Sequence, residues 1–174
     1  MSDMSQIQAT LDQLTTRVEQ LESELAIRNL MTRYGLATDC GEVEIAAACF
    51  AEDATYTVAA PKAGRDGEHD DLVLTGRAAI AGMLSSDLHQ SMLPFTAHTT
   101  GPSEFKITGN QATALGYSRI YLQEDDGPRL MRLAVNRWCF VKTEHGWQIS
   151  ERHSHLVGQD STAAMLRSAL LNTV

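Results

Sequence analysis

Three residues of the chain could together carry acid/base chemistry: Tyr34, Asp39 and His98. An imidazole takes or gives a proton near neutral pH, and a buried phenol can hydrogen-bond a ligand oxygen. Asp39 follows Tyr34 by five residues, which is about 140° further round a regular helix. The two side chains therefore converge only if the helix ends near Asp39, and Gly41 is a typical residue at such an end. The same spacing fits a core tyrosine and an aspartate that caps a helix at 43–50, and a lone strand histidine is more often structural.

Six further polar side chains on predicted strands are candidates for contacting a substrate. They are Tyr56, Ser118, Asn136, Arg137, His153 and His155. Asn136 and Arg137 are adjacent on one strand and face opposite sides, so only one of them could reach a common pocket. The sequence leaves open which of the two does so.

His153 and His155 lie two residues apart and point to one side of their predicted strand. They share that side with Trp147 and Ile149 if the alternation is unbroken. If those two residues fill the interior, both histidines line the pocket; otherwise the histidines lie in solvent or at a subunit contact. Paired histidines can bind a metal, but no third ligand follows at a recognisable spacing, so we predict no metal site.

The sequence lacks the motifs that indicate several other chemistries. It has no G-x-G-x-x-G, no Walker loop and no G-x-S-x-G nucleophile elbow. We therefore expect no nucleotide, flavin or acyl-enzyme chemistry, and no organic cofactor.

Composition narrows the class of protein. A chain of 174 residues with 43% hydrophobic residues suits one folded domain. The net charge of −8, without a Lys/Arg run, excludes nucleic acid as a partner. No apolar run approaches the length of a membrane span, and the first twenty residues lack the apolar block of a signal peptide. Three widely separated cysteines without a C-x-x-C spacing fit a reduced protein, and we expect a cytoplasmic location.

The elements that must position these residues begin with helices. Apolar residues recur every three or four positions from Ile7 to Leu25, which predicts an amphipathic helix that either self-associates or covers its own domain. We expect residues 1–24 to form this extension and residues 25–174 to form the domain. Further helices are predicted at 25–37, 43–50 and 77–88, strands at 53–58 and 72–75, and a polar loop at 61–71.

The second half is rich in strands. Alternating runs at 96–108, 111–123, 129–143 and 147–157 are separated by turn residues, which predicts three hairpins before a last helix at 161–171. Helices followed by a long meander indicate an α+β fold, a curved antiparallel sheet wrapped by helices into a cone with an interior pocket. The strand 112–121 carries small side chains on one side and large side chains on the other. Small residues facing inward leave room for a ligand, and the opposite assignment would fill the cone.

Several short motifs occur in a characteristic order. They are Tyr34-x4-Asp39, Ala47-x-x-Phe50-Ala51-x-Asp53-Ala54, Gly76-Arg77-Ala78-Ala79-Ile80, His98, and Gly146-Trp147-Gln148-Ile149. Over roughly residues 22–160 the chain thus resembles the SnoaL-like proteins of the nuclear transport factor 2-like superfamily. The Tyr, Asp and His positions are similar to those of scytalone dehydratase, bile-acid 7α-dehydratase and diarylpropane lyases.

The resemblance implies a function. It places Tyr34, Asp39 and His98 in the catalytic positions of a cofactor-independent lyase. The expected reaction is dehydration or deformylation of a hydroxylated, hydrophobic aromatic or polycyclic molecule, lignin-derived diarylpropanes included. A ketosteroid-isomerase-type isomerase and a non-catalytic binding domain are the alternatives. The resemblance also favours a homotrimer over a dimer.

Overall fold

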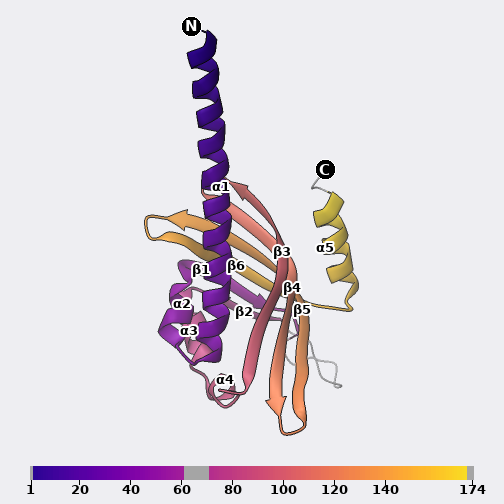
Figure 1. Cartoon of the computed structure of the whole chain (residues 1–174). Helices are drawn as coiled ribbons and strands as arrows, with labels where there is room; N and C mark the ends of the chain where they lie inside the picture. Colours follow the sequence, from indigo (N-terminus) through magenta and orange to yellow (C-terminus); the bar gives the residue numbers. More distant parts are fainter. Residues whose placement is uncertain (1, 61–70, 172–174) are drawn as a thin grey trace.

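The computed structural model describes residues 2–60 and 71–171, and its first element is a single long helix, α1 (Ser2–Asp39). The predicted extension and the helix at 25–37 are therefore continuous, and the N-terminal part of α1 projects beyond the sheet (Figure 1). The helix ends at Asp39, and Gly41 follows with a positive φ of 74°. The predicted end near Asp39 is confirmed. The boundary between residues 24 and 25 stays a prediction.

The elements after α1 comprise short helices and strands, a meander of four long strands (β3–β6) and a last helix. They are α2 (Val43–Ala48), β1 (Phe50–Val58), β2 (Leu72–Thr75), α3 (Arg77–Leu84), α4 (Asp87–Gln90), β3 (Thr96–Thr108), β4 (Gln111–Glu124), β5 (Gly127–Thr143), β6 (Gly146–Leu156) and α5 (Asp160–Leu171). The helix expected at 77–88 is interrupted, because Ser86 caps the N-terminus of α4 and accepts a hydrogen bond from the backbone N–H of His89. The predicted polar loop lies outside the described residues except for Asp71.

The strands form one six-stranded sheet in the order β2-β1-β6-β5-β4-β3. All neighbours are antiparallel except β1 and β6, which run parallel, so the three predicted hairpins are confirmed. The sheet is curved and not closed, and α1 and α5 lie on opposite sides of it (Figure 1). The predicted α+β class is correct.

The core lies on the concave side of the sheet, beneath α1, α2 and α3. Its largest buried side chains include Ile27, Phe50, Trp138, Phe140 and Ile149. The small side of β4 faces this core, with Ala112 and Ala114 buried, whereas Tyr117 of the large side is 48% exposed. Small residues therefore leave space inside the cone, as one of the two assignments predicted. Within the described ranges, no helix combines the length and apolar character that crossing a membrane requires.

Candidate functional site

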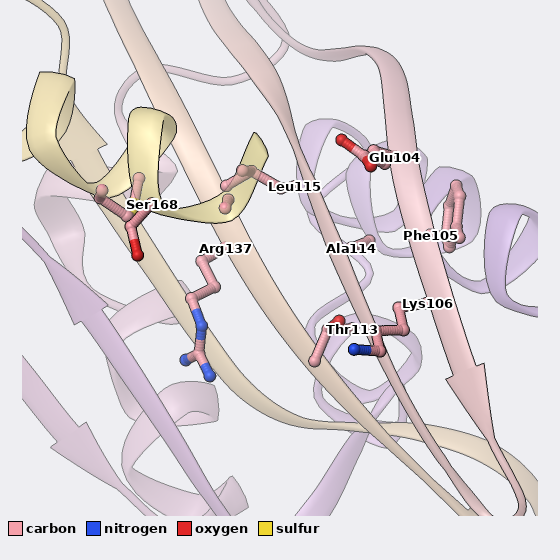
Figure 2. Close-up of a pocket in the computed structure, with 10 residues that line it drawn as sticks. Glu104, Phe105, Lys106, Thr113, Ala114, Leu115, Arg137 and Ser168 are labelled. Carbon is pink, nitrogen blue, oxygen red and sulfur yellow. The ribbon is translucent and has the colours of Figure 1, made fainter. Parts of the chain in front are cut away.

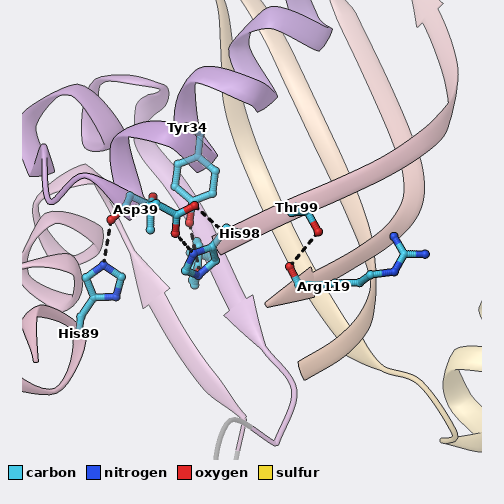
Figure 3. Close-up of polar contacts among 8 residues, drawn as sticks. Tyr34, Asp39, His89, His98, Thr99 and Arg119 are labelled. Carbon is cyan, nitrogen blue, oxygen red and sulfur yellow. Dashed lines mark hydrogen bonds and ion pairs between the residues drawn. The ribbon is translucent and has the colours of Figure 1, made fainter. Parts of the chain in front are cut away.

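The last residue of α1 meets the start of β3. The Asp39 carboxylate accepts two hydrogen bonds from His98, one from the backbone N–H at 2.7 Å and one from ring Nδ1 at 2.6 Å (Figure 3). Asp39 therefore orients His98 and does not cap α2, whose first turn receives no side-chain cap. With Nδ1 donating to the carboxylate, Nε2 is the atom that can accept a proton.

A glycine brings the helix close enough to the strand for this contact. A Cβ at Gly35 would lie 3.2 Å from the backbone oxygen of His98. That separation is tighter than an ordinary van der Waals contact, so a larger residue would move α1 away from β3. Gly35 thereby sets the distance between the elements that carry Asp39 and His98.

Tyr34 lies one turn before Asp39 on the buried side of α1. Its ring packs edge-on against Phe50 and Trp138, and its hydroxyl lies 3.4 Å from that of Tyr56. Burial raises the pKa of the Tyr34 phenol well above its usual value, and the neighbouring Tyr56 adds to the rise. Tyr34 therefore stays protonated and can act as a hydrogen-bond donor.

Two neighbouring pockets, which we call chambers, lie beside these groups. The first, which we call the polar chamber, has a volume of about 210 Å³ and is lined by Ser118, Asn136 and Arg152 among others. The second, the methionine chamber, has a volume of about 360 Å³. Its lining is mostly apolar and comprises Val58, Met83, Leu84, Leu88, Met92, Met131, Leu156, Tyr56, Thr38, His89 and Arg132. Tyr34, His98 and Ile120 line both chambers, so two of the three predicted catalytic residues lie where the chambers adjoin. Asp39 lines neither chamber and reaches the site through its hydrogen bond to His98.

The polar chamber holds an arginine that the sequence analysis missed. Arg152 is 6% exposed, and its guanidinium carbon lies 4.7 Å from the ring centre of Tyr56 and 5.0 Å from that of Trp138. Asn136, a predicted contact residue, is 1% exposed on the neighbouring strand. The Nε and Nη1 atoms of Arg152 and both amide atoms of Asn136 have no hydrogen-bond partner among the described residues.

A β-bulge explains why Arg152 points inward. In the pairing of β5 with β6, Phe140 lies opposite Ile149 but Cys139 lies opposite Glu151, so Ser150 is an extra residue. An extra residue reverses which side of the sheet the following side chains face. Arg152 is therefore buried with the core, although unbroken alternation would have placed it outside.

The same bulge corrects the expectation for the two histidines. His153 and His155 lie on the outer side of the sheet, where their rings stack at 3.8 Å, and neither lines the two chambers. Arg137 also faces outward, pairs with Glu151 at 2.6 Å and lines a separate cavity of about 590 Å³ beside α5 (Figure 2). Of the adjacent pair, Asn136 is the one that reaches the site.

A second histidine, His89, was not among the predicted site residues. It is buried on α4, its Nε2–H donates to the backbone oxygen of Thr38 at 3.4 Å, and its ring lies 6.3 Å from that of His98 (Figure 3). Burial lowers its pKa, so the ring is neutral at pH 7. Nothing in its sequence context separates it from an ordinary exposed helix residue.

Metal ligands are not clustered in the part of the chain that the structure describes. No group of three or more His, Cys, Asp or Glu side chains could hold a metal ion there. The paired histidines on β6 accordingly have no third ligand in residues 2–60 and 71–171.

Comparison with known proteins places the chain in a family. The SnoaL-like domain matches residues 19–153, which include Tyr34, Asp39 and His98. The chain belongs to the SnoaL-like family. No curated protein matches the chain.

Solved structures share the fold of this chain. An NTF2-like protein with a cystatin-like fold from Novosphingobium aromaticivorans is 30% identical, with a TM-score of 0.76 over 88% of this chain and 94% of that one. A variant of Rv3472 of Mycobacterium tuberculosis, a protein described as of unknown function, is 23% identical, with a TM-score of 0.67 over 88% and 89%. A protein from Catenulispora acidiphila in complex with S-DNPA shares the fold at 19% identity, with a TM-score of 0.59 over 75% and 92%.

Proposed function

We propose that this SnoaL-like protein is a cofactor-independent lyase that eliminates water or formaldehyde from a hydroxylated hydrophobic molecule. The observation that carries the proposal is the hydrogen-bonded Asp39–His98 pair at the junction of two chambers that Tyr34 also lines. The mostly apolar methionine chamber suits an aromatic or polycyclic body, lignin-derived diarylpropanes included.

The mechanism assigns one role to each of the three residues. His98 accepts the substrate proton at Nε2, and the Asp39 carboxylate stabilises the imidazolium that forms. Tyr34, held protonated by burial, donates a hydrogen bond to the oxygen that leaves or gains negative charge. In dehydration the imidazolium then returns the proton to the departing hydroxyl, so water leaves and no electron acceptor is needed. In deformylation His98 takes the hydroxyl proton, the carbon–carbon bond breaks and formaldehyde departs. The electron pair of the broken bond stays on the remaining carbon, which takes the proton back from the imidazolium.

The proposal is tested by product analysis on purified, metal-free protein. Hydroxylated diaryl and steroid compounds are incubated with the protein, and mass spectrometry measures whether substrate loses water or formaldehyde. A double-bond shift without a change of mass would replace the lyase by an isomerase, which needs the same base and oxygen donor. Saturable binding without any conversion across the panel would leave only the binding function.

We also propose that the protein associates with copies of itself, a trimer being favoured over a dimer by the resemblance. The stripe from Ile7 to Leu25 supports this, because its six apolar side chains are 49–67% exposed. Ile27 and Tyr34 pack on the domain. At 100° per residue, they lie about 160° and about 180°, respectively, round the helix from Leu25. Most of the stripe therefore faces away from its own domain, although Leu21 lines a cavity with Phe105 and Ile107 of β3, and the part of α1 before Leu25 can pair with another chain.

The charges beside the stripe favour a parallel arrangement. With Leu11, Val18 and Leu25 at heptad positions a, Arg17 occupies position g and Glu22 position e of the next heptad. In a parallel coiled coil these two positions meet across the interface, so each pair of neighbouring helices gains opposite charges. An antiparallel pair would not bring them together in this way.

A further inference from the structure

The polar chamber contains a buried positive charge that no acidic side chain in the described ranges neutralises. Arg152 is 6% exposed and makes no ion pair with the residues that the structure describes. Its guanidinium is held between the rings of Tyr34, Tyr56 and Trp138, at 5.8, 4.7 and 5.0 Å. Aromatic faces stabilise a cation only in part, and a buried charge without a counter-ion lowers the stability of the fold.

Among the described groups around Arg152, the Tyr56 hydroxyl accepts a hydrogen bond from it but no carboxylate is free to pair with it. Tyr34 stays protonated because burial raises its pKa, and Asp39 is engaged by both nitrogens that His98 presents to it. A further charge beside it is another cation, Arg132, which donates to the backbone oxygen of Ala59 at 2.7 Å. Burial lowers the pKa of Arg132, and the neighbouring Arg152 lowers it further. Arg152 lines the polar chamber and Arg132 lines the methionine chamber, so each chamber carries a positive charge.

Asn136 places a second unused donor beside the arginine. On the paired strands β5 and β6, Asn136 lies opposite Ser154 and Trp138 lies opposite Arg152, so the two polar side chains occupy neighbouring positions on the inner face. Both line the polar chamber together with His98. Buried amides and guanidinium groups are almost always hydrogen-bonded in folded proteins, so these unpaired atoms indicate a ligand.

We infer that the polar chamber binds the carboxylate of an amphipathic ligand whose apolar body occupies the methionine chamber. A planar carboxylate accepts two parallel hydrogen bonds from a guanidinium, and the Asn136 amide can donate a third. Methionine side chains adapt to irregular apolar shapes, which suits a bulky body in the second chamber. The identity of this ligand as the substrate rests on the proposed function, whereas the binding site itself does not.

Binding of matched probes tests the inference without any turnover. Isothermal titration calorimetry at pH 7 compares 2-naphthoate with the neutral 2-naphthamide, which has nearly the same shape. We expect naphthoate to bind at least about tenfold more tightly, since a buried charge-assisted pair discriminates strongly against a neutral group. Equal affinities for the two probes would overturn the carboxylate assignment, and tighter binding of inorganic phosphate than of naphthoate would show that the chamber serves a free anion.

Three substitutions assign the preference to the residues. Arg152→Met removes the charge at similar volume and should abolish the preference for naphthoate, whereas Arg137→Met on the outer face should leave it unchanged. Asn136→Asp keeps the fold's shape and supplies an internal counter-ion, so it should raise the melting temperature and suppress naphthoate binding. Retention of the preference in both Arg152→Met and Asn136→Asp would refute the site, and the second variant remains informative if the first does not fold.

The outcome is separable from that of the proposed lyase. His98→Ala should lose turnover and keep the preference for naphthoate, because His98 does not bind the carboxylate. If His98→Ala loses turnover but neither it nor the wild type prefers naphthoate over naphthamide, the carboxylate site is refuted and the lyase is retained. A clear preference in a protein that converts no compound would retain the site and sink the lyase.

Discussion

At the scale of single residues, the Asp39–His98 contact is the feature on which catalysis depends. Asp39→Asn preserves the size of the side chain but places an amide against Nδ1, and the amide can present an NH₂ that favours the other tautomer of His98. We predict that kcat/KM falls about 10²–10³-fold while ligand binding changes little. Steady-state kinetics combined with naphthoate titration measures both, and an unchanged kcat/KM would remove Asp39 from the mechanism.

His89 gives the site a pH dependence of stability. Its pKa is lowered by burial, so the unfolded chain binds more protons than the folded one as the pH falls through the ordinary range of histidine. The stabilisation is therefore present above about pH 6.5 and is lost as the pH falls below it. His153 and His155, whose pKa values burial also lowers, add to the same trend.

We predict that His89→Asn flattens this dependence. The free energy of unfolding, measured by urea denaturation between about pH 5 and pH 7.5, should fall less steeply towards acid in the variant than in the wild type. His145→Asn is the matched control, because His145 is exposed in the turn between β5 and β6. An identical slope for the His89 variant and the wild type would show that His89 is not buried in the neutral form.

At the scale of elements, the approach of α1 to β3 determines the geometry of the site. Gly35→Ala adds a Cβ at 3.2 Å from the backbone oxygen of His98 and should push the helix from the strand. We predict a loss of about tenfold or more in kcat/KM, because displacement by a fraction of an ångström disturbs a catalytic pair. Gly82→Ala on α3 is the control: its Cβ meets nothing within 4 Å, and the change should stabilise the helix without affecting activity. Equal activity of both variants with the wild type would contradict the account.

The elements also show what the sequence could and could not predict. Long alternating runs and turn residues predicted the hairpins β3–β6 within a few residues, because alternation and turn chemistry are local. The helix end at Asp39 was predicted from Gly41 for the same reason. The bulge at Ser150 leaves no local mark, since one inserted residue looks like any other strand residue. As a result, Arg152 was not predicted as a site residue, and the prediction that His153 and His155 line the pocket was wrong.

At the scale of the whole molecule, α1 is proposed to join copies of the chain. In a parallel coiled coil in register, Leu14 at position d faces its own counterpart, whereas Thr16 at position f faces solvent. In a Cys40→Ser background, which removes the exposed native thiol, Leu14→Cys should oxidise to a disulfide-linked dimer and Thr16→Cys should not. Non-reducing electrophoresis reads out the link, and equal linkage of both variants would exclude the parallel arrangement.

Light scattering then gives the number of chains. A mass of three times the 19.0 kDa chain supports the trimer, and a mass of two chains would replace it by a dimer. A monomer at micromolar concentration would contradict self-association altogether. Deletion of residues 1–20 should reduce the measured mass if α1 holds the chains together.

The proposed elimination depends on proton transfer by His98. It is tested by kcat/KM of His98→Ala against wild-type protein, on a substrate whose water or formaldehyde product has been identified. We predict a loss of about 10²–10⁴-fold, as expected for removal of a general base. His145→Ala, which alters an exposed turn histidine, should retain full activity. A His98→Ala variant within a few-fold of the wild type would contradict the account.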